Sequence, residues 1–386
     1  MYKWNKDMFT LPKNIHSVDS LLRLTLCNGC DTYISHSLAE SVKYHKQLIE
    51  SHKTDWDLIK KQVNPYEYIH SHILNKSFSV SAYKPLSRSY YKLVELYYKC
   101  NLVQHFNGNI TTFHLAEGPG GFMEAILNLR NNKKDKYYGM TLIDGKNSPG
   151  WRQHNILSRN ATIILDNGPD NTGNILHPCN YEHCYKHYKG TMDLVTADGG
   201  FDFSNDYNAQ EHNSCKLVFA EVMYAITVQK EGGVFILKLF DCFLQVTNEL
   251  LYILSMMYED VHITKPSTSR CANSERYVVC VNFKNVDHYD YYPKIYNMLS
   301  SIQTDSFIQS IINVPIPIYV CNVLQEINTL LAQTQIEYIN KTINYIKHNN
   351  IPSSLLSANI NKCIYWCNKY NININNKVHD IKNIRI

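Results

Sequence analysis

The sequence predicts an α/β fold with a mostly parallel sheet. Between about residues 86 and 286, short apolar runs alternate with longer segments able to form helices, a pattern typical of parallel strands joined by crossover helices. The seven apolar runs cover residues 111–115, 137–142, 161–165, 194–197, 233–239, 261–264 and 277–283. We therefore expect a seven-stranded sheet. Because the last two runs are separated by a loop too short for a helix, they should pair antiparallel at the sheet edge.

Helical regions are expected on both sides of this α/β domain. Residues 1–80 show helix-like spacing, with Pro65 and Pro85 as breaks. Helix-like runs over 323–332 and 335–346 precede a tail rich in Asn, Ile and Lys. We therefore divide the chain into a helical N-terminal region (1–80), an α/β domain (81–290) and a helical C-terminal region (291–386).

The composition is that of a globular protein in water. Of the 386 residues, 44% are hydrophobic and 19% charged, and the formal net charge of +4 is too small to indicate a nucleic-acid partner by itself. The first residues show no apolar signal region. Lys238, Asp241 and Glu249 interrupt the longest apolar stretch, so we expect no membrane partner and an intracellular location.

Twelve cysteines raise the question of a metal. The relevant residues are one CxxC pair and one short cluster: Cys27, Cys30, Cys179, His183, Cys184 and His187. A structural zinc site needs four suitably spaced ligands, and Cys363 with Cys367 is too widely spaced to supply the missing pair. Free thiols in a reducing compartment are favoured over zinc.

A glycine-rich turn follows the first apolar run. It comprises Glu117, Gly118, Pro119, Gly120, Gly121 and Phe122. The turn matches neither GxGxxG nor a P-loop. An acid at the mouth of such a turn suits a cationic ligand such as S-adenosylmethionine. The glycines would let the protein backbone come close to that ligand. Asp144, after the next run, is placed to meet ribose hydroxyls, or else simply begins the 144–147 turn. A tight turn without any ligand is the alternative for the glycines.

Three charged residues stand at the ends of strand-like runs. Asp198 ends the 194–197 run, Lys238 lies within the 233–239 run, and Glu275 opens the last run after a polar loop. An unpaired buried lysine is costly, so Lys238 should meet carboxylates or lie in a cleft. The alternatives are a lysine that extends to solvent and a surface acid. Lys92, on a helix expected over 87–96, is equally consistent with a solvated helix charge.

With these residues in place, the chain resembles the FtsJ-like ribose 2′-O-methyltransferases, and within them the cap-specific mRNA enzymes. The similarity covers roughly residues 86–286. It rests on the 88–93 helix motif, the 117–122 turn, the 139–142 and 170–174 segments, Ala-Asp-Gly-Gly at 197–200, and most strongly the 265–280 segment.

The resemblance implies a Rossmann-like class I methyltransferase fold with S-adenosylmethionine as cofactor. It implies a Lys-Asp-Lys-Glu tetrad at Lys92, Asp198, Lys238 and Glu275, with Asp170 and Asp198 as cofactor contacts. The implied partner is the 5′ end of capped mRNA, with other capping or transcription proteins as further partners. The enzyme would act in the cytoplasm if virus-encoded, and in the nucleus if cellular.

The chemistry of a ribose 2′-hydroxyl suits this tetrad. The hydroxyl is a weak nucleophile and must lose a proton as it attacks the methyl group, and Lys238 can accept that proton if its pKa is depressed. We expect Lys92 and partial burial to depress it, while Asp198 and Glu275 orient the amine. No metal is required, because the methyl donor arrives already activated.

Expected RNA contacts surround the tetrad. They are Arg88, Phe240, Arg270, Asn273, Ser274 and Arg276. Phe240 is more simply explained as a core residue than as a stacking surface. Two other functions stay open: methylation of ribosomal or transfer RNA by the same tetrad, and a non-catalytic RNA-binding or polymerase-partner subunit on the same fold.

Overall fold

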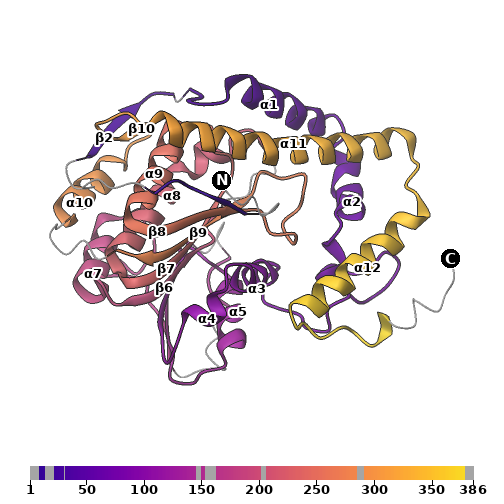
Figure 1. The fold of residues 1–386 in the computed structure, drawn as a ribbon, viewed down its shortest axis with the longest axis horizontal. Coiled ribbons are helices and arrows are strands. Elements are labelled where there is room, and N and C mark those ends of the chain that lie inside the picture. The colour runs from indigo at the N-terminus through magenta and orange to yellow at the C-terminus, as the bar shows by residue number, and fades with distance from the viewer. Residues whose placement is uncertain are drawn as a thin grey trace.

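The computed structural model describes residues 8–13, 21–29, 31–144, 149–152, 162–200, 206–284 and 291–378. At its centre lies an eight-stranded sheet with the order β1-β8-β9-β7-β6-β3-β4-β5 (Figure 1). The strands are β1 (Met8–Thr10), β3 (Thr111–Leu115), β4 (Lys136–Met140), β5 (Ile163–Leu165), β6 (Met192–Ala197), β7 (Gln229–Leu239), β8 (Tyr258–Thr264) and β9 (Arg276–Phe283). Strands β5, β4, β3, β6 and β7 are parallel, as an α/β fold requires.

The predicted α/β fold is confirmed, and each of the seven apolar runs contains a strand. The strand count differs by one because β1 pairs antiparallel with β8, which the local sequence pattern does not reveal. Strands β8 and β9 form the expected antiparallel pair. Strand β9 lies between β7 and β8 and is antiparallel to both. The pair is not at the sheet edge as expected, because β1 lies outside β8; the edge strands among the described residues are β1 and β5.

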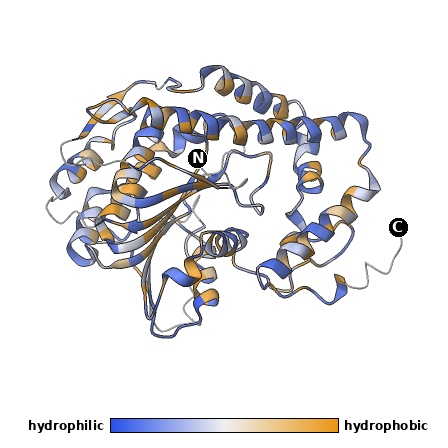
Figure 2. Ribbon diagram, in the orientation of Figure 1, coloured by the Kyte–Doolittle hydropathy of each residue, from blue (hydrophilic) through white to orange (hydrophobic). Residues whose placement is uncertain are grey.

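Helices cover both faces of the sheet. Helices α3 (Ser89–Lys99), α4 (Leu102–His105) and α5 (Gly121–Arg130) lie on one side, and α7 (Pro178–Tyr188), α8 (Gln210–Val228) and α9 (Gln245–Met257) on the other. Successive residues of β7 alternate between two cores: Phe235 and Leu237 pack with α8, Val234 and Ile236 with α3 and α5. The sheet is accordingly apolar throughout its centre (Figure 2), as expected of parallel strands buried on both faces.

The terminal regions contain strands in addition to the expected helices. Strand β2 (Leu22–Cys27) pairs antiparallel with β10 (Phe307–Ile312) in a separate two-stranded sheet. The helices are α1 (His36–Glu50), α2 (Lys53–Val63), the 3-10 turn η1 (Glu67–Ile69), α10 (Tyr292–Ser301), α11 (Ile318–His348) and α12 (Ser353–Lys369). The two helices expected over 323–332 and 335–346 are a single helix, α11, because no helix breaker separates them.

The two terminal regions pack against each other. Helix α11 runs along α1 and contacts α2, and α12 contacts η1 (Figure 1). No helix in the described part of the chain is both long and apolar enough to cross a membrane. The eleven cysteines within the described ranges are free thiols.

Candidate active site

Four charged residues meet at the carboxyl edge of the sheet. Lys92 comes from α3, Asp198 directly follows β6, Lys238 is near the end of β7, and Glu275 directly precedes β9. Lys92 Nζ donates to Glu275 Oε2 at 2.7 Å, and Lys238 Nζ lies 3.2 Å from Asp198 Oδ1. All four side chains are at most 11% exposed. The structure thus brings the four expected residues together as two buried amine–carboxylate pairs.

Tyr277 links the two pairs. Its hydroxyl donates to Asp198 Oδ1 at 2.8 Å and accepts from Lys92 Nζ at 3.3 Å. Tyr277 is paired directly with Lys238 across the β7–β9 ladder, which aims both side chains at the same face. The sequence analysis missed Tyr277 because a tyrosine in a strand resembles a core residue; its position two residues after Glu275 was the available signal.

The pKa values of the two lysines shift in opposite directions. Burial lowers the pKa of Lys92, and the attraction of Glu275 only partly offsets this. Burial also acts to lower the pKa of Lys238, but Asp198 and Glu275 outweigh it, so that pKa is raised. The expectation of a depressed pKa for Lys238 is therefore wrong for this arrangement. The pKa of Glu275, which burial acts to raise, is held well below its usual range by Lys92 and Lys238.

The loop before β9 fixes the position of Glu275. Lys265 Nζ donates to Asn273 O at 2.6 Å, to Asn273 Oδ1 at 2.8 Å and to Glu275 O at 2.8 Å. Ser269 Oγ donates to Glu275 Oε1 at 2.6 Å. Glu95, on α3, accepts the backbone N–H of residue 267 at 2.8 Å. The carboxylate is therefore oriented by its own loop as well as by the lysines.

The glycine-rich turn joins β3 to α5 and is tightly packed against neighbouring parts of the chain. Gly120 has a φ of 110°, a conformation that favours glycine. A Cβ on Gly118 would lie 2.8 Å from the carbonyl oxygen of Gly150, and one on Gly121 would collide with the hydroxyl of Ser87. Other parts of the chain therefore already occupy the space beside Gly118 and Gly121, and no side chain fits at either position.

Glu117 and Phe122 point inward from this turn. The Glu117 carboxylate is buried beneath it, lies 3.0 Å from His114 Nδ1 and accepts a hydrogen bond from Thr196. Burial raises the pKa of Glu117. Phe122 is fully buried, with its ring 5.9 Å from that of Tyr277. Glu117 thus lies under the turn and not at its mouth as expected.

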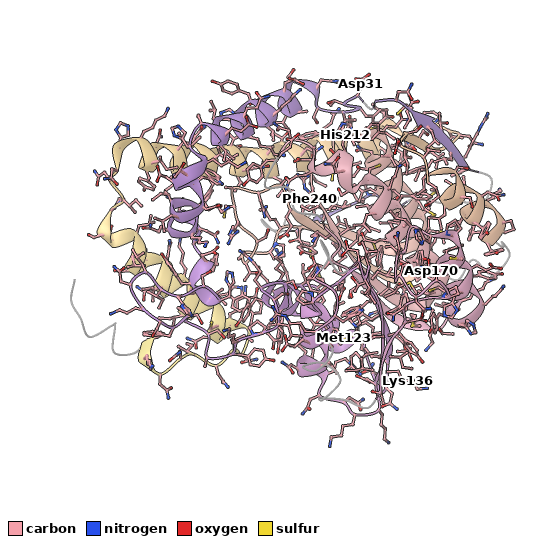
Figure 3. All side chains as sticks on the ribbon, turned by 180° about the vertical axis from the view of Figure 1, so that it is seen from behind. Asp31, Met123, Lys136, Asp170, His212 and Phe240 are labelled. Carbon is pink, nitrogen blue, oxygen red and sulfur yellow. The ribbon has the colours of Figure 1, made fainter. Side chains whose placement is uncertain are left out.

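Asp144 and Asp170 occupy neighbouring loops beyond β4 and β5. Asp144 is exposed. The Asp170 carboxylate accepts from the N–H of Thr172 at 2.9 Å and lies 2.6 Å from His177 Nδ1. The N–H of Ile143 donates to the Thr172 carbonyl at 2.8 Å, which joins the two loops. Figure 3 shows Asp170 on the side of the molecule formed by α7.

Arg88 and Arg270 are both held by one carboxylate from the N-terminal region. Arg270 donates to the two Glu67 oxygens at 3.0 and 2.8 Å, and Arg88 Nη1 lies 3.7 Å from Glu67 Oε2. Arg88 also donates to the Thr268 carbonyl at 3.0 Å. Glu67 is fully buried in η1. The sequence analysis missed Glu67 because it lies 21 residues before Arg88, where the first matched motif begins.

Two expected RNA contacts are interior residues instead. Arg276 is 1% exposed and donates to Asn328 Oδ1 at 2.8 Å. Ser274 is buried, and its hydroxyl donates to Gln210 Oε1 at 2.9 Å. Both side chains therefore bind other parts of the protein, and Arg276 is unsuited to contact RNA. Asn273, by contrast, is partly exposed.

Phe240 closes one side of the tetrad. Its ring centroid lies 5.7 Å from Lys238 Nζ, a cation–π distance. A Cβ on Gly200 would lie 3.1 Å from Lys238 Nζ. Figure 3 shows Phe240 near the middle of the molecule. Because the ring is only 9% exposed, Phe240 packs against the lysine more than it offers a stacking surface.

Glu221 is a further acid beneath the site that the sequence analysis missed. It lies on α8, is fully buried, and its Oε1 accepts the N–H of Gly199 at 3.1 Å. Its Oε2 has no hydrogen-bond partner among the described residues. Burial raises the pKa of Glu221 well above the usual value, which favours the neutral acid next to Asp198.

Within the described ranges, no group of three or more His, Cys, Asp or Glu side chains could hold a metal ion. In the 179–187 cluster, His183 Nε2 lies 2.9 Å from Asp166, and Cys184 is buried in the core. Cys30 falls outside the described residues.

Comparison with known proteins gives consistent matches to one activity class. The chain is 36% identical over 196 residues to "Cap-specific mRNA (nucleoside-2'-O-)-methyltransferase 2" of Drosophila melanogaster, covering 47% of this chain and 28% of that protein. It is also 36% identical over 180 residues to "Cap-specific mRNA (nucleoside-2'-O-)-methyltransferase 1" of Trypanosoma brucei brucei (strain 927/4 GUTat10.1), covering 46% and 48%. The chain thus spans less than half the length of either relative.

Residues 85–283, just over half of the chain, match the family described as FtsJ-like methyltransferase. This range includes all four tetrad residues and ends with the last residue of β9. The resemblance seen in the sequence is thereby confirmed, and with it the cofactor S-adenosylmethionine. The chain belongs to the FtsJ-like methyltransferase family.

Proposed function

We propose that this protein transfers a methyl group from S-adenosylmethionine to the ribose 2′-hydroxyl of a 5′-terminal nucleotide of capped mRNA. The proposal rests on one observation: two buried amines and two carboxylates form a connected cluster beside the glycine-rich turn. Ligands of open α/β sheets bind at this carboxyl edge. The two relatives named above, both cap-specific mRNA methyltransferases, favour a capped substrate.

The residues around the turn suit the cofactor. In the proposed arrangement the backbone at 118–121 approaches it, Asp144 and Asp170 hold its polar groups, and Asp198 faces its cationic end. The tight glycine contacts leave no room for side chains there. Bound S-adenosylmethionine supplies a methyl group on a positively charged sulfur. That charge matches the carboxylates Asp198 and Glu275 in the site.

Lys238 is the proposed base. Its Nζ donates to the Asp198 carbonyl oxygen at 2.7 Å, so the amine has a fixed position from which to receive the hydroxyl proton. In its neutral form, Nζ would take the hydroxyl proton as that oxygen accepts the methyl group; the bound cofactor would supply the methyl group, and its sulfur would keep the bonding electrons as a neutral thioether. Asp198 and Glu275 raise the pKa of Lys238. The positively charged sulfur of bound S-adenosylmethionine would lower that pKa towards the pH at which the enzyme works, because a nearby cation disfavours the charged amine. In this proposal, Lys92 and Glu275 orient the Lys238–Asp198 pair.

Methylation of ribosomal or transfer RNA, and a purely RNA-binding role, are the competing functions. The test is to incubate the protein with labelled S-adenosylmethionine and RNAs of one sequence, capped or uncapped. We expect label only in the capped RNA, at the 2′-oxygen of a 5′-terminal nucleotide. Equal labelling of both RNAs would refute cap specificity, and no labelling would favour the binding role.

A matched pair of lysine variants tests the assignment of the base. Lys238→Met should abolish transfer while cofactor binding, measured by calorimetry, survives. Lys230→Met is the control, because Lys230 lies on the same strand, is exposed and pairs only with Asp193 among the described residues. Normal turnover by the Lys238 variant would remove Lys238 from the mechanism.

A further inference from the structure

Glu221 is a fully buried acid that approaches the tetrad from the face of the sheet opposite to Lys92. It lies on α8, which covers one face, whereas Lys92 lies on α3, which covers the other. Its neighbours along the helix, Ala220 and Val222, are fully buried apolar residues. An acid is costly to bury in such surroundings unless its oxygens make hydrogen bonds inside the protein. The partner of Glu221 therefore bears on what this residue does.

That partner is the peptide unit between Asp198 and Gly199, which is held at both ends. The N–H of Gly199 donates to Glu221 Oε1 at 3.1 Å, and the carbonyl oxygen of Asp198 accepts from Lys238 Nζ at 2.7 Å. These two groups belong to one rigid plane, because the peptide bond is planar. A rotation that released the N–H from Glu221 would therefore also turn the carbonyl oxygen away from Lys238.

Glycine at position 199 makes this contact possible. A Cβ on Gly199 would collide with Glu221 Oε1, and it would lie 2.8 Å from a methyl carbon of Leu217 and 3.1 Å from the Cβ of Ala116. A side chain here would push α8 away from the peptide and break the hydrogen bond. The close approach of Glu221 thus explains why a glycine directly follows Asp198.

The Asp198 carbonyl is the shortest polar contact of the Lys238 amine within the described ranges. Its oxygen lies 2.7 Å from Nζ, closer than the carboxylate oxygen Oδ1 of the same residue at 3.2 Å. The remaining groups that face the amine act through their charge or their ring, and they are Glu275, Glu221, Lys92 and Phe240. The carbonyl, together with the Asp198 carboxylate, therefore decides where Nζ points.

We propose that Glu221 is a positioning residue for methyl transfer: it holds the 198–199 peptide in the orientation that places the amine of Lys238. The inference rests on the proposed function, in which Lys238 takes the hydroxyl proton. Glu221 acts through the backbone and not on the reacting groups. Its consequence is that the tetrad depends on both faces of the sheet, since α3 supplies Lys92 and α8 supplies the acid that holds the peptide.

Two substitutions at Glu221 separate the hydrogen bond from the bulk of the side chain. Glu221→Gln keeps a carbonyl oxygen for the Gly199 N–H, whereas Glu221→Met fills a similar volume without that oxygen. Glu249→Met is the matched control, because Glu249 is also a helical acid, is 1% exposed, and accepts the N–H of Ile311 at 2.6 Å. We expect Glu221→Met to lower kcat by about tenfold or more, with the KM for the cofactor nearly unchanged. Glu221→Gln and Glu249→Met should keep kcat, per folded molecule, within about twofold.

The pH dependence of kcat distinguishes positioning from a merely structural role. The carbonyl oxygen stabilises the charged amine of Lys238, so loss of that contact should lower the pKa of the amine and move the rise of kcat to lower pH. Loss of folded protein alone would reduce the rate at every pH without moving the midpoint. The midpoint should stay in place in Glu221→Gln, which keeps the contact. An unmoved midpoint in folded Glu221→Met would overturn the proposal, and so would an equal shift in Glu221→Gln.

Measurements without RNA separate this proposal from the proposed function. Glycine-selective isotope labelling lets NMR follow hydrogen exchange of the Gly199 amide, and mass spectrometry follows acetylation of the Lys238 amine as a function of pH. In Glu221→Met we expect faster exchange and a lower pH for half-maximal acetylation. Glu221→Asp, whose carboxylate is one methylene further back, replaces that variant if it does not fold. Both changes in a protein that methylates no RNA would refute the proposed function alone, and a methylating protein that shows neither would refute the positioning role alone.

Discussion

Lys46 Nζ on α1 donates a 2.7 Å hydrogen bond to Asp241, three residues beyond the proposed base Lys238. Both side chains are buried, and Arg276 Nη2 lies 3.6 Å from the same carboxylate. Burial acts to raise the pKa of Asp241, but Lys46 and Arg276 hold it below the usual value. The Lys46–Asp241 ion pair therefore connects the N-terminal region to the segment that directly follows β7, the strand that bears the proposed base.

Lys46→Met should destabilise the protein by about 3–5 kcal/mol, because it leaves a buried carboxylate without its main cation. Urea denaturation gives the free energy of unfolding. Lys43→Met is the control, since Lys43 is exposed one turn earlier on α1, and should change it by less than about 0.5 kcal/mol. Equal stability of the two variants would show that the Lys46–Asp241 pair contributes nothing.

Tyr277→Phe should slow methyl transfer by about ten- to hundredfold, because the hydrogen bond from its hydroxyl to Asp198 is lost. The ring remains, so packing against Phe122 and cofactor affinity should persist. Single-turnover kinetics with labelled cofactor measure the effect.

Tyr258→Phe is the control for that experiment. Tyr258 is likewise a fully buried strand tyrosine, and its hydroxyl donates to Gln229 at 3.0 Å, away from the tetrad. We expect a loss of stability without a loss of rate. Slowing of equal size in both variants would mean that Tyr277 acts only through folding.

Glu211 should make stability fall as pH rises from about 4.5 to about 7. Burial raises the pKa of Glu211 to about 7, with a further contribution from Asp241. In this window the folded state binds more protons than the unfolded state, so unfolding becomes easier with rising pH. The lost stabilisation amounts to about 3 kcal/mol, since one pKa unit corresponds to about 1.4 kcal/mol.

Glu211→Gln removes that titration while keeping an oxygen for the N–H groups of Phe243 and Leu244, both 3.0 Å away. Relative to the unmodified protein, the variant should gain about 3 kcal/mol between pH 4.5 and pH 8. Urea unfolding at several pH values measures the difference. Parallel pH profiles for the two proteins would exclude Glu211 as the source.

Glu67→Gln should cost about 3–5 kcal/mol of folding free energy, because Arg88 and Arg270 then face each other without a shared anion. Burial acts to raise the pKa of Glu67, but Arg270 and Arg88 hold it far below the usual value, so the carboxylate stays charged. Removing Arg270 as well, in Glu67→Gln/Arg270→Gln, should recover part of the loss. A double variant no better than the single one would show that the pair does not interact energetically.

Three of the four tetrad residues were predictable because strand ends leave local marks in the sequence, whereas Lys92, on a helix, was implied only by the family resemblance. Lys238 interrupts an apolar run, Asp198 precedes two glycines, and Glu275 follows a polar loop. The parallel sheet then brings such positions to one edge, whatever their separation along the chain. The same logic predicted seven strands from seven apolar runs.

What the sequence did not reveal depends on partners far away in the chain. Arg276 looks like an RNA contact until Asn328 of α11 is seen to bind it. Glu67 lies in a 3-10 turn that has no periodic sequence pattern. Its role is visible only once the structure shows that it pairs with Arg88 and Arg270. The direction of the pKa shift of Lys238 depends on the balance between burial, which lowers the pKa, and Asp198 and Glu275, which raise it. That balance is set by distances, which the sequence does not give.

The pairing of β1 with β8, and of β2 with β10, sets an order of events during synthesis. Met8 lies opposite Thr264, and Cys27 opposite Phe307. During synthesis, β1 and β2 leave the ribosome long before their partner strands. They can pair with β8 and β10 only after most of the polypeptide has been made. Until then the backbone N–H and C=O groups of these segments lack their strand partners and are available to pair with other chains.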